Sequence, residues 1–170
     1  MRDGWMVMVA VLMGASPAFA ASGNAVIKAT KPDSAVSGEV NVVETPNGLR
    51  VGVSLRNVPP GKHGLHIHER GDCADAGNAA GGHYNPQGAP HGFLPRDGML
   101  KAHPGDLGNI EIGEDGTGRL DVTLPGVSLR EGAYTVAQRA IILHEKEDDF
   151  GQPTGNAGGR IGCGVITLAK

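Results

Sequence analysis

Aromatic residues are scarce, at 4% of the 170 positions, and no segment has the apolar spacing of a long amphipathic helix. An excess of charge of one sign is also missing, because the net charge at pH 7 is only −3. Nothing in that balance indicates binding to nucleic acid or to a membrane surface. The sequence has no internal repeat, and its length suits one domain.

A long hydrophobic run is missing as well. The apolar stretch Trp5–Met13 is shorter than the roughly 18–20 residues that a membrane span requires. Small residues at Ala18 and Ala20 follow it and fit a signal-peptidase site. We therefore expect residues 1–20 to be a signal peptide cleaved near Ala20, and residues 21–170 to be a periplasmic or secreted domain that is free of the membrane.

Only two cysteines are present, Cys73 and Cys163. An exported protein meets an oxidising compartment, so a disulfide is expected between them. Its closed loop of 90 residues would contribute roughly 4–5 kcal/mol in the chain-entropy model. Two metal thiolates are less favoured because no neighbouring Cys-x-x-Cys is present. Two free thiols remain open at this point.

Glycine is abundant, at 28 residues, and short valine-rich segments lie between turn-forming residues. The clearest strand is Leu49–Arg56, where apolar and polar residues alternate directly after the hairpin signal Asn47-Gly48. Strand character is found in eight segments: 24–30, 39–44, 49–56, 64–69, 109–112, 119–124, 140–144 and 164–168. About eight strands with no obligatory helix predict an all-β antiparallel sandwich or barrel.

Two histidines stand on one of these strands, in the segment Gly64–Glu69. Because side chains alternate along a strand, His66 and His68 point to one face, and Leu65 and Ile67 to the other. By the same parity His63 belongs to the apolar face, where a hydrogen-bonded structural histidine is expected rather than a ligand. Taken alone, His-x-His is more often two surface histidines than a metal site.

Two long glycine-rich loops, residues 70–107 and 145–162, have little periodicity. Loops of this length in a compact domain are generally functional. Six histidines and one aspartate lie on or beside the first loop and the strands that flank the loops: His66, His68, His83, His91, His103, His144 and Asp106. Imidazole suits copper and zinc. The set is too large for one four-coordinate ion and is sufficient for two ions if one histidine bridges them.

Five segments, in this order, resemble the copper,zinc superoxide dismutase family: Gly64–Glu69, Gly81–Pro86, His91-Gly92 with His103–Asn109, His144–Asp149 and Gly155–Gly164. The resemblance covers almost all of residues 21–170. Residues 93–100 are closer to the exported bacterial members. The resemblance implies an immunoglobulin-like, eight-stranded antiparallel Greek-key barrel with two long functional loops.

The resemblance also implies a site, with one copper and one zinc per subunit. Copper would be bound by His66, His68, His83 and His144, and zinc by His83, His91, His103 and Asp106. His83 would bridge the ions and carry a catalytic proton, and Arg160 would guide the anionic substrate superoxide. Asp148 would join copper and zinc ligands through hydrogen bonds. Cys73 and Cys163 match the family's disulfide.

The implied activity converts superoxide to dioxygen and hydrogen peroxide. The main alternative is a non-catalytic periplasmic copper/zinc-binding protein, which the copper ligands alone would allow. A copper-only relative is disfavoured by His91, His103 and Asp106. A zinc-stabilised structural sandwich is disfavoured by four histidines suited to redox copper. A homodimer is expected, although bacterial and eukaryotic members do not share one dimer surface.

Overall fold

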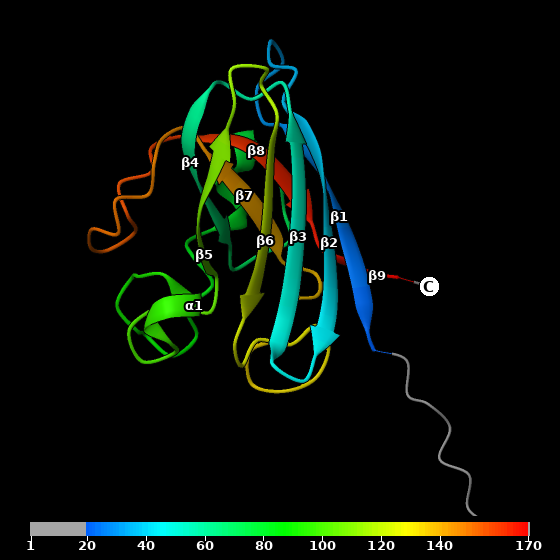
Figure 1. Cartoon of the computed structure of the whole chain (residues 1–170), viewed down its shortest axis with the longest axis vertical. Helices are drawn as coiled ribbons and strands as arrows, with labels where there is room; N and C mark the ends of the chain where they lie inside the picture. Colours follow the sequence, from blue (N-terminus) through cyan, green and yellow to red (C-terminus); the bar gives the residue numbers. More distant parts are fainter. Residues whose placement is uncertain (1–19, 170) are drawn as a thin grey trace, which may run out of the picture.

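The computed structural model describes residues 20–169, so most of the expected signal peptide, residues 1–19, lies outside the described residues. Nine strands form a single antiparallel sheet (Figure 1). They are β1 (Ser22–Ala29), β2 (Ser37–Thr45), β3 (Gly48–Arg56), β4 (Gly61–Ile67), β5 (Asp106–Ile112), β6 (Gly118–Leu124), β7 (Ala140–His144), β8 (Arg160–Val165) and β9 (Thr167–Leu168). Among residues 20–169, no helix is long and apolar enough to cross a membrane.

Eight of the strands close into a barrel. The strand order is β2-β3-β6-β5-β4-β7-β8-β1, and β1 also pairs with β2, which joins the two ends. The ninth strand, β9, is two residues long and pairs with the beginning of β1. The predicted all-β, eight-stranded barrel is therefore confirmed. Two short helices, η1 (Asp75–Ala80) and α1 (Leu94–Asp97), lie in the first long loop.

Alternating burial along β3 explains how the chain builds its core. Leu49, Val51, Val53 and Leu55 are buried, whereas Arg50, Ser54 and Arg56 are exposed. Burying four such side chains stabilises the fold by about 1.5–3 kcal/mol each before the cost of ordering the chain. The apolar core therefore fills the interior of the barrel, as the sequence pattern predicts.

The last strand begins earlier than the sequence suggests. Residues 160–162 were expected to belong to the second loop, but they pair with the end of β7: His144 lies opposite Arg160 and Leu143 opposite Gly162. The strand then breaks at Ile166, whose buried side chain joins the core, before the two residues of β9. Cross-strand pairing therefore outweighs the local glycine content.

The histidine strand β4 is buried on both faces. Leu65 and Ile67 belong to the apolar core, while His66 and His68 face the opposite side. That side is covered by the two long loops, residues 70–105 and 145–159, which lie along the same flank of the barrel (Figure 1). The barrel supplies a rigid wall, and the loops enclose the histidines against it.

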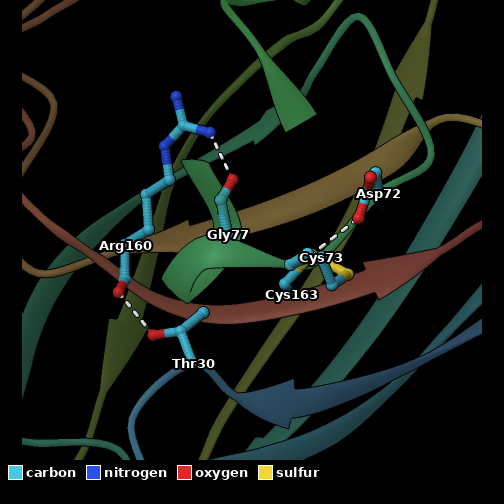
Figure 2. Close-up of a disulfide and its surroundings, with 7 residues drawn as sticks. Thr30, Asp72, Cys73, Gly77, Arg160 and Cys163 are labelled. Atoms are coloured by element: carbon cyan, nitrogen blue, oxygen red, sulfur yellow. Dashed lines mark hydrogen bonds between the residues drawn. A yellow bond between two sulfur atoms is a disulfide. The ribbon is translucent and has the colours of Figure 1, made fainter. Parts of the chain in front are cut away.

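The disulfide Cys73–Cys163 ties the first loop to β8, with the two Cα atoms 5.8 Å apart. This confirms the expected pairing, and the alternatives of metal thiolates and free thiols are wrong. The bond anchors the loop immediately before η1 (Figure 2). A loop with few apolar residues is thereby held against the barrel by a covalent link.

Candidate metal centre

Four buried histidines converge on the outer side of β4. They are His66, His68, His83 and His144, and each offers one ring nitrogen that lies within 4.8 Å of the others. Strand β4 carries His66, β7 ends at His144, and an isolated bridge pairs His68 with His83 of the first loop. Residues distant in sequence are therefore brought together by strand pairing.

The other ring nitrogen of each of three histidines already has a hydrogen-bond partner. His66 Nε2 lies 2.8 Å from Asp148 Oδ2, His68 Nδ1 lies 3.0 Å from the Gly81 carbonyl, and His144 Nδ1 lies 3.3 Å from the Gly158 carbonyl. Such partners fix the tautomer and orient a ring that binds a metal. The remaining nitrogens are left facing one another.

These facing nitrogens have no hydrogen-bond partner outside their own group. His68 Nε2 and His144 Nε2 are only 3.3 Å apart, and buried His66 Nδ1 has no hydrogen-bond partner. A buried nitrogen without a partner costs free energy, on the order of 1–3 kcal/mol. The arrangement fits a copper ion, because copper favours neutral imidazole ligands.

A second buried group adjoins the first and shares His83 with it. Its members are His83, His91, His103 and Asp106. Asp106 Oδ1 lies 3.1 Å from Nδ1 of both His83 and His103, and Asp106 Oδ2 lies 2.9 Å from His91 Nδ1. Although the two atoms are close, their contact does not have the geometry of a hydrogen bond, so His91 Nδ1 has no hydrogen-bond partner. Three nitrogens and one carboxylate directed at one point fit zinc.

Asp106 is held in place by the backbone of the first loop. Its Oδ2 accepts hydrogen bonds from the N–H groups of Gly92 (3.0 Å) and His103 (2.9 Å). His103 is itself a member of the group, and Gly92 directly follows another member, His91. The carboxylate therefore organises the loop as well as contributing an oxygen atom.

The buried carboxylate of Asp148 joins the two groups. Its oxygens lie 2.8 Å from His66 Nε2 and 2.9 Å from His91 Nε2. Two side-chain amides hold this contact from behind. Asn109 binds both backbone groups of Asp148, and Gln152 binds both backbone groups of His91. The two groups are therefore joined through one buried, hydrogen-bonded carboxylate.

Burial keeps the facing histidines neutral. It lowers the pKa of His68 to about 2, of His144 to about 3 and of His83 to about 4. Nearby rings and Arg160 add to this effect at His68 and His144. A neutral imidazole retains the lone pair that a metal needs. At neutral pH these three side chains are therefore in the state that binds copper.

Around Asp106, Asp148 and His91, the interactions between charged groups affect the pKa values more than burial does. Burial opposes ionisation of Asp106 and Asp148, but hydrogen bonds from the surrounding histidines hold the pKa of both carboxyls well below the usual range. Burial likewise acts to lower the pKa of His91, but the two carboxylates outweigh it and raise that pKa to about 9. The carboxylates stay ionised, and Asp106 gives the second group an anionic ligand that the first group lacks.

Arg160 lies at the mouth of a pocket of about 210 Å³ that also exposes His68, His83 and His144. Its guanidinium donates hydrogen bonds to the carbonyls of Gly77 (2.5 Å) and Gly81 (2.6 Å). Figure 2 shows Arg160 to the left of the disulfide, with its carbonyl accepting a hydrogen bond from Thr30. The positive charge is therefore fixed beside the open side of the first group.

His63 takes no part in either group. Its ring is buried, with Nδ1 2.9 Å from the His144 carbonyl and Nε2 2.8 Å from the Pro59 carbonyl. The expectation of a hydrogen-bonded structural histidine agrees with these contacts. Every other histidine identified from the sequence lies in one of the two groups.

Three contributors to the site were not identified from the sequence: Asn109, Gln152 and Gly155. Asn109 lies in a motif that was recognised, three residues after Asp106, so its position in that motif, in the middle of β5, was a usable signal. Gln152 stands in a glycine-rich loop with no local signal. Gly155 packs so closely that an added Cβ would lie 1.9 Å from Asp148 Oδ1.

A closed β-barrel carrying two buried histidine groups that share one imidazole defines a dinuclear metalloprotein. The chain belongs to the copper/zinc superoxide dismutase family, whose model matches residues 36–166. An extracellular Cu-Zn superoxide dismutase of Brugia pahangi is 34% identical over 144 residues, covering 79% of this chain and 70% of the relative. The crystal structure of the clock protein EA4 matches with a TM-score of 0.77 and 34% identity, over 92% of this chain and 100% of that one.

Proposed function

We propose that the protein disproportionates superoxide: two superoxide anions and two protons give one dioxygen and one hydrogen peroxide. The observation that carries this proposal is the pocket beside Arg160. It opens onto ring edges of His68, His83 and His144, so a small anion can reach the first group directly. Membership of the family supports the same activity.

Each group would hold one ion. Copper would be held by His66, His68, His83 and His144, and zinc by His83, His91, His103 and Asp106. Copper supplies one-electron chemistry when bound, because it alternates between Cu(II) and Cu(I), whereas zinc has no redox chemistry. His83, the residue common to both groups, would bridge the two ions.

The protein's own residues would then bind the substrate and move a proton. Arg160 attracts superoxide and donates hydrogen bonds to it. While its Nε2 is not bound to copper, His83 would take one proton from solvent on that nitrogen and give it to the peroxide product, whose second proton would come from solvent. Asp106, which lies 3.1 Å from the other nitrogen of His83, keeps the ring oriented throughout.

The alternative is a metal-binding protein without catalysis. Such a protein needs the two buried groups, but it does not need the first group to be accessible from solvent. The pocket beside Arg160 favours the enzyme, because it leaves the first group open to an anion and places a fixed cation there.

The decisive experiment is superoxide decay measured with the copper- and zinc-loaded protein. The loaded protein should accelerate decay far beyond buffer, and His66→Ala should abolish that acceleration. Arg160→Ala should slow turnover and weaken its dependence on ionic strength while copper stays bound. Arg56→Ala, which removes an exposed arginine of β3, is the matched control. A loaded protein no faster than buffer would overturn the proposal.

We also propose that the chain is exported and loses residues 1–20. The disulfide supports an oxidising location, and the relative from Brugia pahangi is named extracellular. N-terminal sequencing of the protein recovered from outside the cytoplasm should begin at Ala21. Homodimer formation stays a prediction, to be measured by sedimentation equilibrium.

A further inference from the structure

A second opening reaches the metal centre, and Arg160 does not line it. It has a volume of about 340 Å³, and its lining includes Glu69, Ala89, Gln152 and two ring edges, those of His83 and His103. The pocket beside Arg160 shares only His83 and Thr154 with it. The centre is therefore open to solvent at two distinct places.

The second opening leads to the zinc group. Within that group the side chains of His91 and Asp106 are fully buried, whereas His103 keeps 6% of its side-chain surface exposed. His103 lines the second opening but not the pocket beside Arg160. The exposed edge of His103 therefore connects the zinc group to solvent at the second opening and not at the pocket beside Arg160.

The two openings carry opposite charge. Arg160 is the charged side chain at the first, and Glu69 is the charged side chain at the second. The Glu69 carboxylate is exposed and accepts a hydrogen bond from the Gly82 N–H (3.1 Å), which holds it at the rim. The neighbouring Arg70 does not line this opening: its Nε donates to the Ala79 carbonyl (2.8 Å), and its guanidinium lies beside Gly81, near the Glu69 carboxylate.

We propose that the second opening is the route by which zinc reaches and leaves its group, with Glu69 as the electrostatic guide. A fixed cation repels a divalent metal and a fixed carboxylate attracts it. Anions would therefore enter through the pocket beside Arg160, and metal cations through the second opening. This proposal rests on the assignment of zinc to His83, His91, His103 and Asp106. It adds to that assignment a path and a residue that binds neither metal in the final site.

The test is the rate of Co²⁺ uptake by the full-length, metal-free, disulfide-intact protein, with Co²⁺ as a visible probe of the zinc group. Glu69→Gln keeps the shape and an oxygen acceptor for Gly82 but removes the charge. It should slow uptake roughly three- to tenfold at low ionic strength, and the difference should shrink as salt screens the charge. Ala89→Lys places a cation in the same lining and should slow uptake as well.

Glu114→Gln, which removes an exposed carboxylate from the β5–β6 turn, is the matched control and should leave the rate unchanged. The final stoichiometry of Co²⁺ at the zinc group should be the same in all variants, since Glu69 is not a ligand. Equal uptake rates for wild type, Glu69→Gln and Ala89→Lys would overturn the route while leaving the site assignment intact. Failure of the wild type to bind Co²⁺ through His103 would overturn both.

Discussion

Asn109 binds both backbone groups of Asp148 through one side-chain amide: its Nδ2 donates to the Asp148 carbonyl (2.8 Å), and its Oδ1 accepts from the Asp148 N–H (2.7 Å). Asn109 belongs to β5, so the second loop is attached to the barrel at this point. The Asp148 carboxylate in turn contacts both His66 and His91. One strand residue therefore holds the backbone of the carboxylate that joins the two groups.

Asn109→Ala should weaken metal binding without removing any ligand. The change leaves the Asp148 N–H and carbonyl without partners, at a cost of about 1–3 kcal/mol for each group that stays buried. Zinc affinity, measured by competition with a chelator, should fall by about tenfold or more. Asn41→Ala, at an exposed position of β2, is the control, and equal affinities in the two variants would contradict the role of Asn109.

Gly155→Ala should disrupt the contact between Asp148 and His91 through a steric clash. The new Cβ would lie 1.9 Å from Asp148 Oδ1 and 2.6 Å from His91 Nε2, so the carboxylate must move. Gly88→Ala is a matched control, because Gly88 has a similar positive φ (+68° against +76°) but open space around its Cα. We expect zinc affinity to fall in the first variant only. A similar loss in both variants would attribute the effect to backbone strain instead.

Opening the disulfide should impair catalysis as well as stability. Cys73→Ser with Cys163→Ser frees the segment that carries the Gly77 and Gly81 carbonyls, and these carbonyls position Arg160. The free energy of unfolding should fall by about 4–5 kcal/mol in the chain-entropy model. Turnover of the copper-loaded variant should fall toward that of Arg160→Ala. Unchanged turnover would show that the guanidinium is held without the bond.

The stability of the metal-free protein should be greatest near pH 6.5–7. Between about pH 4 and 6.5 the unfolded chain binds more protons than the folded one, since burial lowers the pKa values of His68, His83 and His144. Stability is therefore lost as pH falls through this window, by up to about 1.4 kcal/mol per pH unit for each histidine.

Above that window the sign reverses. The raised pKa of His91, about 9, means that the folded state binds the extra proton between pH 6.5 and 9, so stability is lost as pH rises. Urea unfolding of the metal-free protein from pH 4 to 9 measures both limbs. Loaded with metal, the protein should show a much flatter profile, because metal replaces protons on these nitrogens.

The sequence is most informative where a pattern is local. Alternation along Leu49–Leu55 predicts β3, and parity in β4 separates His63 from His66 and His68. The convergence of the two histidine groups follows from matching family segments and not from spacing, because those residues come from distant strands and loops.

The remaining features depend on tertiary contacts. The amide contacts of Asn109 and Gln152 join residues 39 and 61 positions apart, and no local pattern reports them. The early start of β8 at Arg160 likewise arises from pairing with β7. Arg160 could be selected as a guide for an anion, but its carbonyl partners in the first loop could not be.

The bond between Cys73 and Cys163 encloses residues 74–162 in one covalent ring. This ring contains strands β5, β6 and β7, the short helices η1 and α1, and every candidate ligand except His66 and His68. A protease that cuts the exposed second loop once therefore releases no fragment. A chain nicked in this way still keeps its metal ligands on one covalently connected molecule.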